Sequence, residues 1–85
     1  MNNEEQNTNN HIRTTNTALA AYLVSEGFGT PDIDFEGDRA SFVFSKEDPT
    51  IEKAISNFDT ARATSNTVLF FNAYKSLLRR IRERY

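Results

Sequence analysis

Hydrophobic residues recur at helical spacing over residues 17–26, which predicts the first helix of the chain. The apolar positions on its main face are Leu19, Tyr22 and Leu23. Either Thr15 or Asn16 is suited to cap this helix, because a side-chain oxygen there accepts a hydrogen bond from a free backbone N–H of the first turn. Gly27 is a suitable left-handed residue to end the helix, and Phe28 is then placed to fold back on it.

Alternating apolar and polar residues on either side of Gly37-Asp38 predict a β-hairpin with a two-residue turn. The turn fixes the register, and the expected cross-strand pairs are Glu36 with Arg39, Phe35 with Ala40, Asp34 with Ser41, and Ile33 with Phe42. In this register apolar residues face each other and the charged partners have opposite signs. One face therefore carries the hydrophobic side chains, which are Ile33, Phe35, Ala40, Phe42 and Phe44.

A second helix is predicted to begin at Asp48-Pro49. Aspartate favours the N-cap, and proline fits the first helical position because no hydrogen bond is required of its nitrogen there. The apolar residues that follow have the i, i+3, i+4, i+7 spacing of one helical face: Ile51, Ala54, Ile55 and Phe58. Residues 59–64 then read as a loop.

A long third helix extends from a cap at Ser65 or Asn66 to about Glu83. Its apolar stripe consists of Phe70, Phe71, Tyr74, Leu77, Leu78, Ile81 and Tyr85. Val68 and Leu69 lie off this stripe, so they either pack under the preceding loop or form a contact patch for another chain. Most aromatic residues occupy predicted core positions, and the expected exceptions are Tyr85 and one of Phe70 or Phe71.

These elements predict a small α+β domain over residues 12–85, with the order α-β-β-α-α and an antiparallel hairpin covered on one face by helices. Residues 12–15 are permissive for an additional edge strand. Residues 1–11 contain five asparagines and one apolar residue, so we expect a disordered polar leader there. The chain of 85 residues has room for a single domain.

The composition argues against catalysis and against most metal and redox sites. The chain has no cysteine and one histidine, His11, which excludes disulfides, Cys-ligated zinc and His-based triads. Its longest apolar run, residues 18–24, is shorter than a membrane span requires, and no secretory signal is visible. We therefore expect a cytoplasmic, non-enzymatic protein that uses no cofactor or metal and does not enter a membrane.

Acidic residues between Asp32 and Asp38 resemble the start of a calcium-binding EF-hand loop. The twelfth position of such a loop, however, is Val43, where the bidentate glutamate is required. The same acids alternate with apolar residues along the predicted hairpin. We therefore interpret them as the solvent-facing side chains of a strand.

Charge is distributed unevenly along the chain. Residues 1–60 carry eleven acidic and four basic side chains, a net charge of −7, whereas residues 61–85 carry six basic and one acidic side chain, a net charge of +5. On the third helix, Lys75, Arg79 and Arg82 lie on one flank of the apolar stripe, and Arg80 and Arg84 lie on the other. These bases either complement the helix dipole and the acidic first half, or bind nucleic acid.

Several runs of the chain resemble a family of small uncharacterised proteins that are frequent in bacteriophages and prophages. They are residues 14–23 (TTNTALAAYL), 26–28 (EGF), 41–44 (SFVF) and 71–77 (FNAYKSL), together with Phe58. The resemblance covers about residues 12–84 and leaves out the leader. It implies the fold and an origin in a mobile element, but no activity and no site residues.

From these observations we predict a protein-interaction module of phage or mobile-element type that binds a host or viral protein. A second copy of the same chain is an alternative partner. Nucleic acid, bound by the basic third helix, is the alternative function. The candidate binding residues are Val68, Leu69, Lys75, Arg79, Arg80, Arg82 and Arg84.

Overall fold

The computed structural model describes residues 11–84. Its elements are β1 (His11–Thr14), α1 (Thr17–Ser25), β2 (Asp32–Glu36), β3 (Arg39–Ser45), α2 (Thr50–Asp59) and α3 (Thr67–Arg84). The predicted α+β class is confirmed, and the additional edge strand is present as β1. This strand begins at His11, which the sequence had placed in the leader, and residues 1–10 of that leader lie outside the described residues.

β3 is the central strand of a three-stranded antiparallel sheet with the order β1-β3-β2. The hairpin register is the predicted one, with Ile33 opposite Phe42. β1 pairs with the other edge of β3, where Ile12 lies opposite Phe44. Because successive side chains alternate between the faces of a strand, these apolar residues share one face, and the acids of β2 lie on the other.

The ends of α1 are formed as the sequence predicted. The side chain of Asn16 accepts a hydrogen bond from the backbone N–H of Leu19 at 3.1 Å, which makes Asn16 the N-cap. At the other end Gly27 has a φ of +94°, and the N–H of Phe28 donates to the carbonyl of Leu23 at 3.1 Å. The ring of Phe28 then packs against the core. These contacts fix both the amino-terminal and the carboxyl-terminal end of α1.

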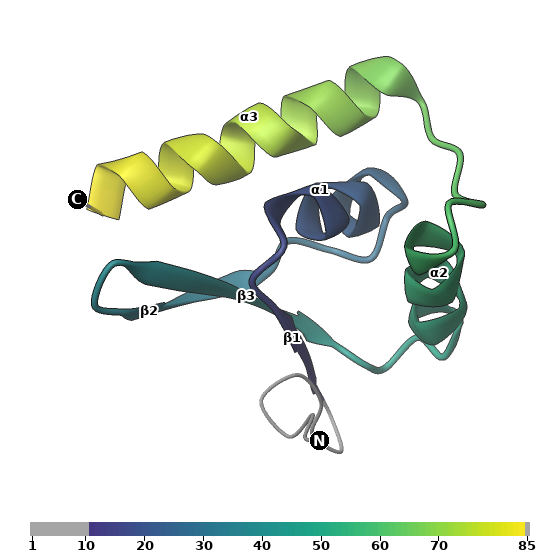
Figure 1. The fold of residues 1–85 in the computed structure, drawn as a ribbon, viewed down its shortest axis with the longest axis horizontal. Coiled ribbons are helices and arrows are strands. Elements are labelled where there is room, and N and C mark those ends of the chain that lie inside the picture. The colour runs from purple at the N-terminus through teal and green to yellow at the C-terminus, as the bar shows by residue number, and fades with distance from the viewer. Residues whose placement is uncertain (1–10, 85) are drawn as a thin grey trace.

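α1 is buried on all sides rather than on one face. Every residue from Leu19 to Leu23 is buried. Figure 1 shows the reason: α1 lies between the sheet and α3, with α2 beside it. Ala20, Ala21 and Ala73 all belong to the core, and their short side chains let the two helices approach closely.

α2 is fixed at its start by two polar contacts. The Asp48 carboxylate accepts hydrogen bonds from the hydroxyl (2.6 Å) and the backbone N–H (3.0 Å) of Thr50, and these hydrogen bonds lower the pKa of Asp48. Helix α2 begins at Thr50, so Pro49 takes the N-cap position predicted for Asp48, while the Asp48 carboxylate still binds the first helical N–H. Lys46 forms an ion pair with Glu52 at 2.9 Å, which ties the first turn of α2 to the end of β3.

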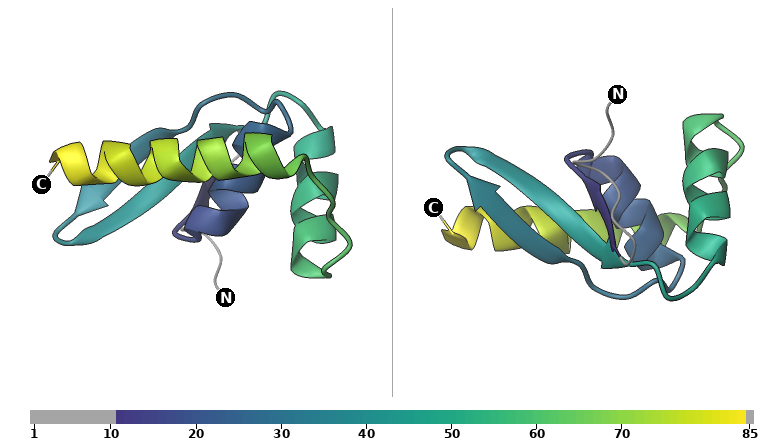
Figure 2. Two further views of the ribbon diagram at one scale, coloured as in Figure 1. Left: turned by 90° about the horizontal axis from the view of Figure 1, so that it is seen from above. Right: turned by 90° about the horizontal axis from the view of Figure 1, so that it is seen from below.

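The core lies between the sheet and the helices. Its largest fully buried side chains are Phe42 and Phe44 of β3, Leu23 of α1 and Ile51 of α2, together with Pro31. Seen from above and below, α3 runs across α1 and continues over the β2–β3 hairpin (Figure 2). The helices α1 and α3 therefore lie on one side of the sheet, and no helix of residues 11–84 covers the opposite face.

The two faces of β3 predict a sharp contrast between neighbouring substitutions. Phe42→Ala removes a side chain with 0% exposure and leaves a cavity, so it should lower the free energy of unfolding by about 3–5 kcal/mol. Ser41→Ala acts on the uncovered face and should change it by less than about 0.5 kcal/mol. Urea unfolding of both variants measures the difference, and equal stabilities would show that the faces are assigned wrongly.

Candidate functional site

The first turns of α3 expose a group of large hydrophobic side chains. Val68, Leu69 and Phe71 are 65%, 54% and 57% exposed, and among the described residues they are the large hydrophobic side chains that are most open to solvent. We call these three residues the apolar patch. Of the two sequence interpretations, packing of Val68 and Leu69 under the preceding loop is wrong, because both side chains are exposed.

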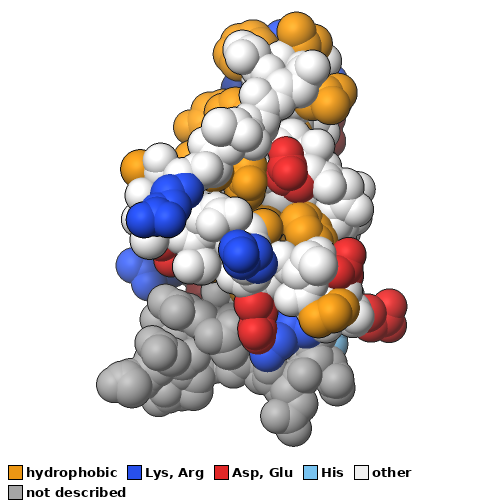
Figure 3. Space-filling view, turned by 90° about the vertical axis from the view of Figure 1, so that its right-hand side faces the viewer, with side chains coloured by type: hydrophobic (Ala, Val, Ile, Leu, Met, Phe, Trp, Pro, Cys, Tyr) orange, Lys and Arg blue, Asp and Glu red, His pale blue; other side chains and the backbone are white. Residues whose placement is uncertain are grey.

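The chain between α2 and α3 presents the apolar patch at one end of the molecule. Ala61 has a φ of +61°, and the N–H of Arg62 donates to the carbonyl of Asn57 at 2.7 Å, which ends α2 and turns the chain. Asn66 then caps α3, since its side chain accepts a hydrogen bond from the N–H of Leu69 at 3.0 Å. Figure 3 shows hydrophobic side chains gathered at the upper end of the molecule, where α3 begins.

Phe71 was assigned to the buried stripe of α3, and this assignment is corrected by its exposure. Of the two neighbouring aromatic residues, Phe70 is half-buried and stacks on Tyr74 with ring centroids 6.1 Å apart. A rotation of 100° separates consecutive helical residues, so Phe70 packs against the core while Phe71 faces solvent. The expectation that one of this pair is exposed is thus confirmed, whereas Tyr85 lies outside the described residues.

Three candidate bases follow the apolar patch along the exposed side of α3. Lys75, Arg79 and Arg82 are exposed, and we call them the basic ridge. The ion pairs found within residues 11–84 are Arg13–Asp34 and Lys46–Glu52, so the basic ridge makes none there. Pairing of these bases with the acidic first half, which was one sequence interpretation, is therefore absent from this part of the chain.

Lys75 joins the basic ridge to the apolar patch. Its Nζ lies over the ring of Phe71, 5.3 Å from the ring centroid, which is within the range of a cation–π contact. The contact holds a hydrophobic and a charged group next to each other on one turn of helix. The exposed side of α3 is thus a continuous surface, apolar at its start and basic towards its end.

The remaining two candidate bases do not join this surface. Arg80 is half-buried, and its Nη1 is buried without a hydrogen-bond partner among the described residues. It lies on the opposite flank of the helix from the basic ridge, as its spacing predicts. Arg84 is the last residue of α3, and its side chain lies outside the described part of the chain.

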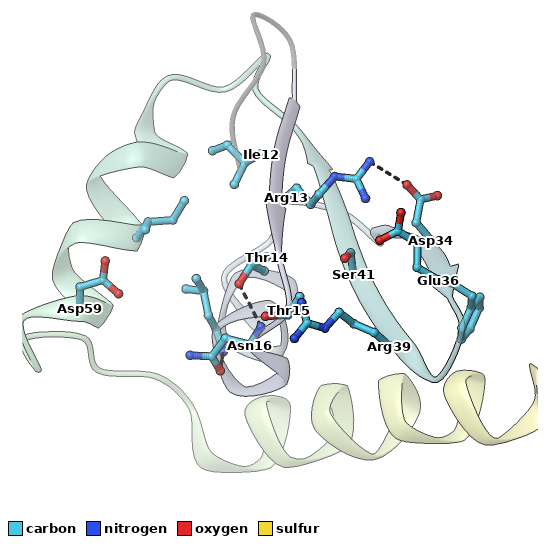
Figure 4. Close-up of a pocket in the computed structure, with 13 residues that line it drawn as sticks. Ile12, Arg13, Thr14, Thr15, Asn16, Asp34, Glu36, Arg39, Ser41 and Asp59 are labelled. Carbon is cyan, nitrogen blue, oxygen red and sulfur yellow. Dashed lines mark hydrogen bonds and ion pairs between the residues drawn. The ribbon is translucent and has the colours of Figure 1, made fainter. Parts of the chain in front are cut away.

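The uncovered face of the sheet holds an open groove of about 690 Å³ that extends to α2. Its polar lining includes Arg13, Asp34, Glu36, Arg39 and Ser41 (Figure 4). Arg13 reaches across β3 to Asp34 with an ion pair of 2.7 Å, and Glu36 lies opposite Arg39. The lining also includes Asp59 of α2, so three acids face two bases and the groove offers no preference for an anionic ligand.

Metal ions and membranes have no evident site in residues 11–84. No three His, Asp or Glu side chains gather there in a way that would hold a metal ion. Within the same range, no helix combines the length and the apolar character that crossing a membrane requires. The exposed side of α3 is therefore the strongest candidate site in the described part of the molecule.

The basic ridge makes no ion pair within residues 11–84, which predicts that Arg79 and Arg82 contribute little to folding. Replacing both Arg79 and Arg82 by glutamine should change the free energy of unfolding by less than about 1 kcal/mol, because only the interaction with the helix dipole is lost. Urea unfolding of the double variant tests this. A loss above about 2 kcal/mol would mean that these arginines are part of the fold rather than of a surface.

Comparison with known proteins identifies the chain at the level of the family. No curated protein and no solved structure matches it. Residues 9–83 match the family described as "Domain of unknown function (DUF5659)". The match includes all three strands and both shorter helices, and it extends through α3 to Glu83. The chain therefore belongs to this family, DUF5659.

Proposed function

We propose that this domain is a non-enzymatic protein-interaction module that binds a partner protein through the exposed side of α3. The observation that carries the proposal is the apolar patch, which lies directly beside a basic ridge without ion pairs in the described chain. The hydrophobic side chains that line the 690 Å³ groove, in contrast, are buried or half-buried: Ile12, Leu19, Phe35 and Ile55. The exposed side of α3 thus offers both hydrophobic area and charge to a partner.

The apolar patch is a reasonable energetic basis for binding. Single exposed hydrophobic residues are common on protein surfaces, but this patch groups three within four consecutive residues, with Val68 and Phe71 on one side of the helix and Leu69 on its flank. Its area of a few hundred Å² corresponds to several kcal/mol on burial at about 25 cal/mol per Å², before the cost of association. This fits a module that engages one helix or loop of a partner rather than a large obligate interface.

The biological setting is the less specific part of the proposal. The resemblance to proteins of bacteriophages and prophages supports a phage or mobile-element origin. The partner is then a host or viral protein in the cytoplasm of the bacterial host.

Capture from a bacterial host lysate tests the proposal. The full chain, immobilised and incubated with nuclease-treated lysate, should retain a specific protein that a variant with Val68→Ser and Phe71→Ser does not retain. Arg39→Gln serves as the control, since it changes an exposed side chain on the other side of the sheet and should retain the same protein. Both substituted positions of the double variant are exposed, so its melting temperature should stay within a few degrees of the parent. Equal capture by all three proteins would contradict the proposal.

The alternative function, nucleic-acid binding, is favoured by the basic ridge alone, which makes no ion pair within residues 11–84. Three phosphate contacts would make affinity fall roughly 40-fold when the salt concentration rises fourfold. We expect instead no micromolar binding at physiological salt, because the chain is acidic overall and the ridge adjoins an apolar patch. Fluorescence titration of labelled single- and double-stranded oligonucleotides at two salt concentrations measures this. Tight, salt-sensitive binding that Arg79→Glu with Arg82→Glu abolishes would make nucleic acid the preferred partner.

A further inference from the structure

The exposed side of α3 has the residue spacing of a second helix-packing seam. Its inner side already packs on α1 and the core through residues that include Ala73, Leu77 and Ile81. A second set of residues recurs at alternating intervals of three and four: Val68, Phe71, Lys75, Leu78 and Arg82. This is the spacing at which one helix packs against another. Four of the five are exposed, and Leu78 is half-buried. We call this set the outer seam.

We propose that the outer seam binds an acidic amphipathic helix of a partner protein, aligned antiparallel to α3. This inference rests on the proposed function and specifies the chemistry of the partner. The order of residues along the seam sets the direction. Val68 and Phe71 lie at the start of α3, whereas the basic ridge lies towards its end. A complementary helix needs apolar residues opposite the first pair and carboxylates opposite the ridge.

The antiparallel direction follows from helix electrostatics. In that orientation the amino-terminal half of the partner helix lies over the basic ridge. Acidic residues are most favourable near the amino terminus of their own helix, where the dipole is positive. The two helix dipoles are also opposed, which is the attractive arrangement. In the parallel orientation the acids of the partner would have to lie at its carboxyl-terminal end, where the dipole is unfavourable to them.

A second copy of the same chain does not satisfy the outer seam over its full length. In an antiparallel pair centred on Lys75, the Lys75 side chains of the two copies face each other, and Val68 of one copy faces Arg82 of the other. In a parallel pair Lys75 and Arg82 each face the same residue of the other copy. Both arrangements place like charges together or an arginine against a hydrophobic side chain, which is destabilising. Charge complementarity therefore favours a different chain that carries acids.

Designed peptides test the inference with the intact protein. The first probe is a helical peptide of the same length as α3, 18 residues, with glutamates at the seam positions of its amino-terminal half and leucines at those of its carboxyl-terminal half. The second has the same composition with the two halves exchanged. Nuclear magnetic resonance of the ¹⁵N-labelled chain locates the binding site, and fluorescence anisotropy measures the affinity.

The first peptide should shift the amide signals of residues 68–82 and bind about tenfold more tightly than the exchanged peptide. A variant with Lys75→Glu and Arg82→Glu should lose this preference and instead favour a peptide with lysines in place of the glutamates. This reversal separates direct charge pairing from loss of the fold, because a misfolded variant would bind neither peptide selectively.

Three results would overturn the inference. They are equal affinity for the two peptide orders, amide shifts outside α3, and a homodimer in sedimentation experiments that Phe71→Ser dissociates. If the lysate capture described above depends on Val68 and Phe71 while the peptides are bound equally, the interaction module stands and the acidic helix is wrong. If neither experiment depends on these residues, the proposed function itself fails.

Discussion

The structure depends on the enclosure of α1, a helix of nine residues, between the sheet and α3. Its five consecutive buried residues include two alanines with no exposed surface, so both the sheet and α3 lie close to its backbone. A domain of this size buries a modest fraction of its surface, and a helix covered on all sides adds much to that fraction. The core joins Phe42 and Phe44 of β3 to Ala73 and Leu77 of α3. Helix α1 lies between these two elements (Figure 1).

The exposed surface of α3 is a consequence of this arrangement. At 1.5 Å per residue, α1 is about 14 Å long and α3, with 18 residues, is about 27 Å long. The short helix therefore packs along only part of the long one, beneath its amino-terminal half, while the outer side of α3 stays exposed (Figure 1). The apolar patch lies in the first turns of α3, where Phe70 packs against the core while Val68 and Leu69 are exposed. The packing of α3 on α1 thus also determines which side of α3 remains open to a partner.

Much of the fold was predictable because it is encoded locally. The hairpin register follows from a two-residue turn and the pairing of apolar residues, and both are visible in the sequence. The caps at Asn16 and Asn66 and the carboxylate of Asp48 follow from the chemistry of helix ends. These features involve residues close together in the chain, so no knowledge of the tertiary arrangement was required.

The remaining features depend on which elements lie side by side, and the sequence does not record this. A run of apolar residues such as 18–24 is compatible with burial on one face or on all faces, and the position of α3 decides between them. Phe71 and Phe70 are adjacent in an apolar segment, and only the placement of α1 distinguishes them. Likewise, the opposite net charges of the two halves suggested internal pairing, but the basic ridge lies on the far side of α3 from the sheet. The residue types of the candidate site were therefore predictable from the sequence, whereas the sequence did not show which residues lie at the edges of the site.

Native-state hydrogen exchange tests the enclosure of α1 most directly, because it reports the stability of each backbone hydrogen bond. The account predicts that amides in the second half of α1 and around Leu77 of α3 exchange only through global unfolding, with the same free energy. Amides in the first turns of α3 should exchange more readily. Rapid exchange throughout α3 while α1 remains fully protected would contradict the account, since α1 cannot stay buried once α3 has left it.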